Sequence, residues 1–73
     1  MATLKNGYTV QERKAPYENF FDVFNLDGKM VCTYTQSSDH VTLIWVYGST
    51  GYAFPVEVRF KSDVELFRYK GWE

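Results

Sequence analysis

Residues 40–60, HVTLIWVYGSTGYAFPVEVRF, decide the fold because two apolar segments flank the turn sequence GSTG. A reversal centred on Ser49 and Thr50 predicts two antiparallel strands with eight apolar side chains on one face, which we expect to face the core. The expected cross-strand pairs are Tyr47 with Tyr52, Trp45 with Phe54, Leu43 with Val56 and Val41 with Val58. The opposite face is apolar only near the turn, and it carries His40, Thr42, Ile44, Val46, Ala53, Pro55, Glu57 and Arg59. This second face needs a covering layer that the segment itself does not supply.

Apolar and polar residues that alternate between turn signals, with many β-branched and aromatic side chains, predict five strands. These strands cover residues 8–13, 20–25, 29–35, 40–47 and 52–60. Pro55 has no backbone amide to donate, so the last strand is expected at a sheet edge or with Pro55 outside the hydrogen-bonded ladder.

The Asp27-Gly28 dipeptide is typical of a tight hairpin turn. A two-residue loop there pairs Val23 with Cys32 and Phe21 with Tyr34. One face of this hairpin then carries Phe21, Val23, Met30, Cys32 and Tyr34, and the other carries Phe20, Asp22, Phe24, Val31, Thr33 and Thr35. A three-residue loop with Gly28 in a bulge competes with this register and would mix the two sets.

The pattern changes after residue 60. Ser62 and Glu65 fit a capping box, and Gly71 followed by Trp72 fits a left-handed C-terminal cap. These signals predict a helix of about two turns over residues 63–70, with a sixth strand over residues 64–69 as the alternative. The expected fold class is α+β: mainly antiparallel β, with about five strands in a sheet or small open barrel and one short C-terminal helix. The 73 residues are expected to form a single domain, 1–73.

Aromatic residues are the compositional outlier, since six Tyr, six Phe and two Trp make up 19% of the chain, more than a small core can hide. A single cysteine, Cys32, rules out an internal disulfide framework, which favours a reducing compartment. The N-terminal residues carry no apolar leader, and the longest apolar run, residues 43–47, is too short to cross a bilayer. The expected location is the cytoplasm, without a membrane partner.

No residue pattern indicates catalysis. One His and one Cys cannot form a tetrahedral zinc site, so neither a metal nor a cofactor is expected. Ser37, Ser38, Asp39 and His40 include the residue types of a hydrolytic triad, but adjacent positions point apart, and a polar turn explains the segment. Cys32 is expected in the hairpin core, where a thiol behaves as a small apolar group rather than as a nucleophile. We therefore do not expect an enzyme.

One short helix can cover only one side of the predicted sheet, so apolar side chains on the other side are expected near the surface. These candidate partner-binding residues are Phe20, Phe24, Val31, Ile44, Val46 and Pro55. They predict a non-catalytic protein that binds another protein, or a second copy of itself, through this face or an unpaired strand edge. The small size and the absence of catalytic motifs also suit an inhibitor that blocks a larger enzyme by occupying its surface. A phage protein directed against a host defence nuclease would be one example.

Single-stranded nucleic acid is the alternative ligand. The candidate residues for it are Arg59, Lys61, Arg68 and Lys70. They lie beside Phe60 and Tyr69, and small β domains bind single strands by combining aromatic rings with basic side chains. However, Asp63 and Glu65 lie between the two basic groups and the net charge is −1, whereas neutralisation of phosphates dominates such affinity. A protein is therefore the first expected partner and nucleic acid the second.

Overall fold

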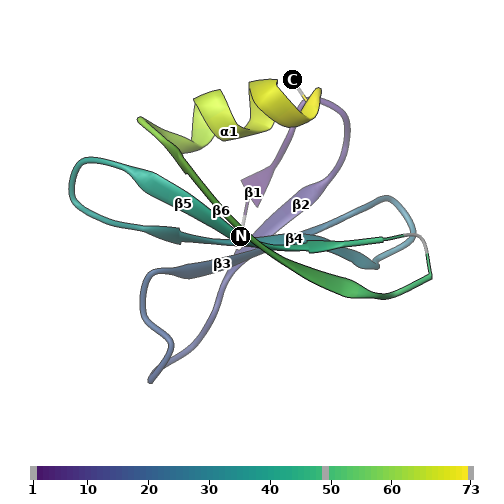
Figure 1. The fold of residues 1–73 in the computed structure, drawn as a ribbon. Helices are drawn as coiled ribbons and strands as arrows, with labels where there is room; N and C mark the ends of the chain where they lie inside the picture. Colours follow the sequence, from purple (N-terminus) through teal and green to yellow (C-terminus); the bar gives the residue numbers. More distant parts are fainter. Residues whose placement is uncertain (1, 49, 73) are drawn as a thin grey trace.

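The computed structural model describes residues 2–48 and 50–72. In this part of the chain, six antiparallel strands form one open sheet and a single helix follows (Figure 1). The elements are β1 (Ala2–Thr3), β2 (Thr9–Glu12), β3 (Phe20–Phe24), β4 (Met30–Gln36), β5 (Val41–Tyr47), β6 (Ala53–Phe60) and α1 (Asp63–Lys70). The prediction of a mainly antiparallel β fold with one C-terminal helix is confirmed. The sheet has six strands rather than about five because β1, which no sequence pattern indicated, pairs with β2.

The strands pair in chain order from β1 to β6, so the sheet is a meander. Its two edge strands, β1 and β6, do not pair with each other in the described ranges, which makes the sheet open rather than a closed barrel. The position of β6 at an edge agrees with the proline at residue 55, because an edge strand tolerates the loss of an amide donor.

Three of the hairpin connections use the same kind of turn. In each, a glycine with positive φ ends a three-residue loop, and its amide donates to the carbonyl three residues earlier. The bonds run from Gly7 to Leu4 (2.9 Å), from Gly28 to Asn25 (3.0 Å) and from Gly51 to Gly48 (2.9 Å). Ser49, on which the expected β5–β6 reversal was partly centred, lies outside the described residues. The competing three-residue loop, and not the two-residue loop, therefore closes the β3–β4 hairpin.

We expect Gly28→Ala to lower the free energy of unfolding by about 1 kcal/mol. Gly28 has φ of 78° and a Cβ built there meets nothing within 4 Å, so the cost comes from backbone strain alone. Gly28→Asn should cost less, because Asn tolerates the left-handed conformation. Urea unfolding of the three proteins measures this order, and an alanine variant as stable as the parent would contradict the assigned turn.

Beyond its turn, the β3–β4 hairpin returns to the expected register. The confirmed pairs are Val23 with Cys32 and Phe21 with Tyr34. A register shift between Val23 and Phe24 absorbs the extra loop residue. As a result, Met30 and Val31 exchange the faces predicted for them: Val31 packs against the core, while Met30 Sδ lies 3.6 Å from the Thr33 hydroxyl on the other face.

The β5–β6 hairpin departs from the predicted register. The observed pairs are Tyr47 with Ala53, Val46 with Phe54, Trp45 with Pro55, Leu43 with Val58, Thr42 with Arg59 and Val41 with Phe60. Ile44 lies at an irregularity in both of the ladders that β5 forms, so Ile44 and Trp45 both lie on the side away from the core. A one-residue slip reverses every side chain that follows it. Trp45 and Tyr47 therefore leave the face predicted for them, and Val46 packs against the core instead.

The helix α1 occupies the predicted residues, and its caps explain why. The Ser62 hydroxyl accepts a hydrogen bond from the Glu65 amide (3.4 Å), whereas the Glu65 carboxylate accepts from the Lys61 amide (2.9 Å) rather than from that of Ser62. At the other end Gly71 adopts the left-handed conformation, and the Trp72 amide donates to the carbonyl of Phe67 (2.9 Å).

The core lies between α1 and one face of the sheet. Its buried residues are Val10, Val23, Cys32, Tyr34, Val41, Leu43, Leu66 and Phe67. Three aromatic rings connect the two layers, because Phe21 stacks on Tyr34 (5.2 Å between centroids) and Tyr34 meets Phe67 edge to face (5.9 Å). The helix lies on this side of the sheet, and in the described part of the chain the opposite side carries no helix (Figure 1).

Candidate functional site

The face of the sheet turned away from α1 is the candidate site, and we call it the open face. Along the central strands its side chains alternate with those of the core. Its large apolar side chains are those of Phe20, Phe24, Met30, Ile44, Trp45, Tyr47 and Pro55, and its polar side chains include those of Arg13, Asp22 and Thr33, with Gln11, Thr35, Thr42 and Arg59 on the same side by register. Large apolar side chains therefore lie among polar ones, and within the described residues no second layer covers this face.

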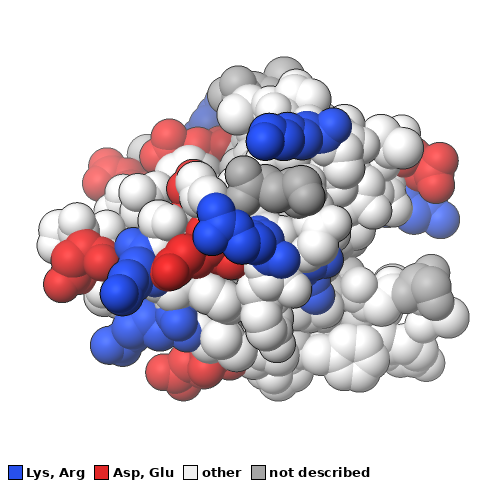
Figure 2. Space-filling view, turned by 90° about the horizontal axis from the view of Figure 1, so that it is seen from above, with Lys and Arg blue, Asp and Glu red and all other residues white. Residues whose placement is uncertain are grey.

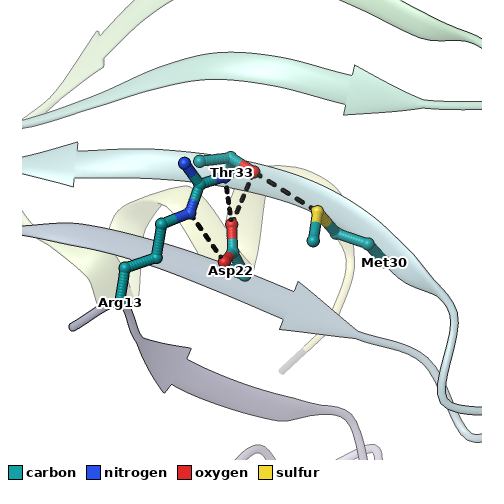
Figure 3. Close-up of polar contacts among 4 residues, drawn as sticks. All are labelled: Arg13, Asp22, Met30 and Thr33. Atoms are coloured by element: carbon teal, nitrogen blue, oxygen red, sulfur yellow. Dashed lines mark hydrogen bonds and ion pairs between the residues drawn. The ribbon is translucent and has the colours of Figure 1, made fainter. Parts of the chain in front are cut away.

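A hydrogen-bonded network occupies the centre of the open face (Figure 3). Arg13 binds Asp22 through two parallel hydrogen bonds, from Nε to Oδ2 and from Nη2 to Oδ1, both 2.9 Å. The Thr33 hydroxyl donates to the same Oδ1 at 2.8 Å. Asp22 is 8% exposed and Thr33 is 0% exposed, so the open face buries polar groups as well as apolar ones. Such groups are stable there because each has a partner.

Arg13 is both fixed and accessible. Its hydrogen bond to Asp22 raises the pKa of the guanidinium above the usual value, and its side chain remains 31% exposed. The guanidinium carbon lies 5.4 Å from the ring centre of Phe20 and 5.9 Å from that of Tyr17. Trp45, 39% exposed, lies on the same face opposite Thr33. The open face therefore presents a held cation beside exposed aromatic rings.

The structure divides the six predicted partner-binding residues between two faces. Phe20, Phe24, Ile44 and Pro55 lie on the open face; the first three are half-buried and Pro55 is exposed. Val31 and Val46 instead pack against the core on the helix side, which corrects the face predicted for both. The physical reason is the pair of register shifts, one in each hairpin, that reverse the side chains beside them.

Sequence reasoning missed several residues of the open face. Trp45 and Tyr47 were assigned to the core, Met30 to the wrong face, and Arg13 to no role at all. No pattern within β5 reveals the outward position of Trp45, because that position follows from the irregularity at Ile44, which involves both neighbouring strands. The ion pair likewise leaves no local pattern, because Arg13 directly follows β2 whereas Asp22, nine residues later, lies on β3.

The residues of the nucleic-acid alternative are only partly brought together. Arg59, Lys61 and Arg68 line a shallow hollow where β6 passes into α1. Lys70 lies elsewhere, with its Nζ 5.7 Å from the ring centre of Trp72. On the helix side of the molecule, Lys and Arg are interspersed with Asp and Glu instead of forming one basic surface (Figure 2).

The polar turn after β4 forms no hydrolytic arrangement among the described residues. His40 Nδ1 lies 2.7 Å from Asp39 Oδ1, and this hydrogen bond lowers the pKa of the exposed Asp39 carboxyl. Neither Ser37 nor Ser38 bonds to His40 through its hydroxyl in this part of the chain; the Ser37 amide donates to the His40 carbonyl (2.8 Å). In the described ranges no three His, Cys, Asp or Glu side chains are grouped as metal ligands would be, and no helix is long and apolar enough to cross a membrane.

Native Cys32 should resist alkylation by iodoacetamide at about pH 8, near the ordinary pKa of a thiol. The side chain is buried in the core, and desolvation raises the pKa of the thiol to about 12, so the reactive thiolate is scarce in the folded state. Unfolding in urea should expose Cys32 and make its alkylation faster. Mass spectrometry of alkylated protein measures both rates, and equal rates with and without urea would contradict the burial.

Comparison of the chain with models of protein families, with curated proteins and with solved structures found no match. Its function is therefore inferred from the residues and their geometry.

Proposed function

We propose that the protein is a non-catalytic module that binds another protein through the open face. The observation that carries this proposal is an aromatic-rich sheet face that no layer of residues 2–48 and 50–72 covers, with Arg13 held on it by Asp22. Apolar and aromatic side chains left at the surface on one face mark interaction sites on small soluble domains.

The composition of the open face supports a protein as the ligand. Trp, Tyr and Arg are the side chains that most often contribute large binding energies at protein interfaces. Trp45, Tyr47 and Arg13 lie together here, and Arg13 is held in one orientation by the buried carboxylate of Asp22. A side chain that is ordered before binding loses less conformational freedom on binding.

A blocking inhibitor is the form of this function that the chain suits best. A domain this small offers little room for a catalytic pocket, whereas an uncovered sheet face with aromatic side chains can cover the working surface of a larger enzyme. A phage protein that acts against a host defence enzyme would be one case.

The test is affinity capture from cell extract with the parent protein and with two open-face variants, Phe24→Asp and Trp45→Asp. A carboxylate in either position would be buried against the partner, so captured proteins specific to the open face should be lost from both variants. Val64→Asp is the matched control, because Val64 is exposed on α1 and belongs to the other side of the molecule. Mass spectrometry identifies the captured proteins, and circular dichroism checks that each variant folds.

Two results would overturn the proposal. One is a set of captured proteins that both open-face variants retain. The other is unfolding of Phe24→Asp and Trp45→Asp to the same degree as a core variant, which would make these residues structural. Light scattering on the parent protein identifies self-association, the case in which the partner is a second copy.

Single-stranded nucleic acid binding is the second candidate function. The observation that favours it is the convergence of Arg59, Lys61 and Arg68 beside the rings of Phe60 and Tyr69. Its test is binding of a short oligothymidylate, whose affinity should fall steeply with added salt.

A further inference from the structure

The strand β6 leaves one row of its backbone groups unpaired. It is eight residues long, and only β5 pairs with it in the described part of the chain. Pro55 lacks an amide and interrupts the first half of this edge, whereas residues 57–60 contain no proline. The second half of β6 therefore presents amide and carbonyl groups in the spacing that another extended chain would need.

The same half of β6 faces a hollow beside α1. The hollow has a volume of about 490 Å³ and is lined by Arg59, Phe60, Lys61, Glu65, Arg68 and Tyr69. The rings of Phe60 and Tyr69 lie together, with 5.2 Å between their centroids, and Tyr69 is 66% exposed. An open strand edge beside a helix flank is the arrangement in which peptides add to a sheet as an extra strand.

The charges of the hollow favour an acidic ligand. Arg59, Lys61 and Arg68 make no ion pair within the described residues. The one carboxylate among the lining residues, that of Glu65, already accepts a hydrogen bond from the Lys61 amide. Lys61 and Arg68 thus lie beside one anion that is engaged in capping the helix, and Arg59, whose side chain alternates with that of Phe60 along β6, adds positive charge at the same edge.

We propose that the edge of β6 and the flank of α1 form a second binding site, which takes an extended, acidic segment of a partner protein as a seventh strand. Backbone groups of residues 57–60 pair with the added segment, and its carboxylates lie against Arg59, Lys61 and Arg68. The inference shares with the proposed function the claim that the protein binds proteins, but it concerns the edge of β6 and the flank of α1 and does not require the aromatic residues of the open face.

Two features favour a peptide over the other occupants. A nucleic acid strand could contact the cations but cannot continue the ladder of amides and carbonyls. A second copy that paired β6 with β6 about Val58 would match Glu57 with Arg59. It would also place Lys61 opposite Pro55, without a carboxylate to meet it.

The experiment titrates the labelled protein with a synthetic octapeptide in which Val and Glu alternate, capped at both ends. Amide chemical shifts and hydrogen exchange are recorded by NMR. We expect saturable shifts confined to β6 and α1, together with slower exchange of β6 amides. Three control peptides separate the contributions: Gln in place of Glu removes the charge, Lys reverses it, and N-methylation of alternate residues removes the backbone pairing but keeps the side chains.

The matched protein variants are Arg59→Gln with Lys61→Gln in one chain, and Lys14→Gln as a control for lost positive charge elsewhere. Lys14 is exposed in the connection between β2 and β3 and does not line the hollow. The double variant should bind the acidic peptide roughly threefold to tenfold more weakly, the range for two exposed ion pairs, and Lys14→Gln should bind like the parent. Trp45→Asp should also bind the acidic peptide as the parent protein does. Peptide binding at β6 can therefore be observed even if the open face binds no protein.

The proposal is overturned if the N-methylated peptide binds as well as the parent peptide, because pairing with β6 would then play no part. It is also overturned if the Lys peptide binds as tightly as the Glu peptide. Two further outcomes contradict it: the oligothymidylate shifts the same amides more strongly than the peptide does, or the shifts of β6 depend only on protein concentration. The last two outcomes would assign the site to nucleic acid or to a second copy. If no amide shifts at the highest peptide concentration, the edge of β6 accepts no added strand.

Discussion

Replacing Leu66 with Ala should lower the free energy of unfolding by about 3 kcal/mol, the largest effect expected of any single substitution discussed for this chain. Leu66 is 0% exposed and belongs to the cluster through which α1 contacts the sheet. A helix of eight residues has little stability of its own, so its packing contacts hold it in place. Since a domain of this size is stable by only roughly 5–10 kcal/mol, the variant should lose a large part of its free energy of unfolding.

Val64→Ala is the matched control for Leu66→Ala, since both substitutions put Ala into the same short helix. Val64 is 43% exposed, and we expect its replacement to change the free energy of unfolding by less than about 0.5 kcal/mol. Urea unfolding followed by tryptophan fluorescence gives both values. If the two variants are equally stable, α1 does not form the core layer described above.

Asp22→Ala should lower the free energy of unfolding by about 2 kcal/mol. The substitution removes the partner of the Arg13 guanidinium and leaves the buried Thr33 hydroxyl with only the weak acceptor Met30 Sδ. The larger penalty of an isolated buried charge does not apply in full, because the Arg13 side chain is 31% exposed and water can reach it. Asp22→Asn should cost less, because it keeps an oxygen that can accept from Thr33.

Glu18→Ala is the control for the loss of one negative charge, since Glu18 is exposed in the connection between β2 and β3. The cost of Asp22→Ala should persist in high salt, because added salt screens partly buried pairs much less than exposed ones. Thermal and urea unfolding at low and high salt provide the measurement. If the cost disappeared in salt, or if Glu18→Ala cost as much, the network would be an ordinary surface ion pair.

The parts of the fold that local chemistry determines could be predicted from the sequence. Ser62 and Glu65 at one end and Gly71 at the other fixed the helix at residues 63–70, because each cap depends on residues within one turn. Most strands were likewise located to within about one residue. The two-residue strand β1 was missed, since so short a segment has no periodicity and forms through its pairing with β2.

The faces of the sheet could not be predicted with the same success, and this affected the candidate site. A strand pattern has a period of two, so an extra residue in a turn or a bulge reverses every side chain after it. The irregularity at Ile44 depends on both neighbours of β5 and leaves no mark in β5 alone. It placed Trp45 on the open face and Val46 in the core, whereas Phe20, Phe24 and Pro55 stayed where the sequence pattern put them.

The pairing of every strand with its neighbour in the chain has a consequence for how the protein folds. The loops that close three of the hairpins are only three residues long, so little chain entropy is lost when these strand pairs form. No strand must wait for a partner from the far end of the chain. Such topologies, rich in contacts between nearby residues, reach their folded state faster than β sandwiches with crossed connections. The sheet can therefore assemble hairpin by hairpin, with α1 docking as the last segment of the chain.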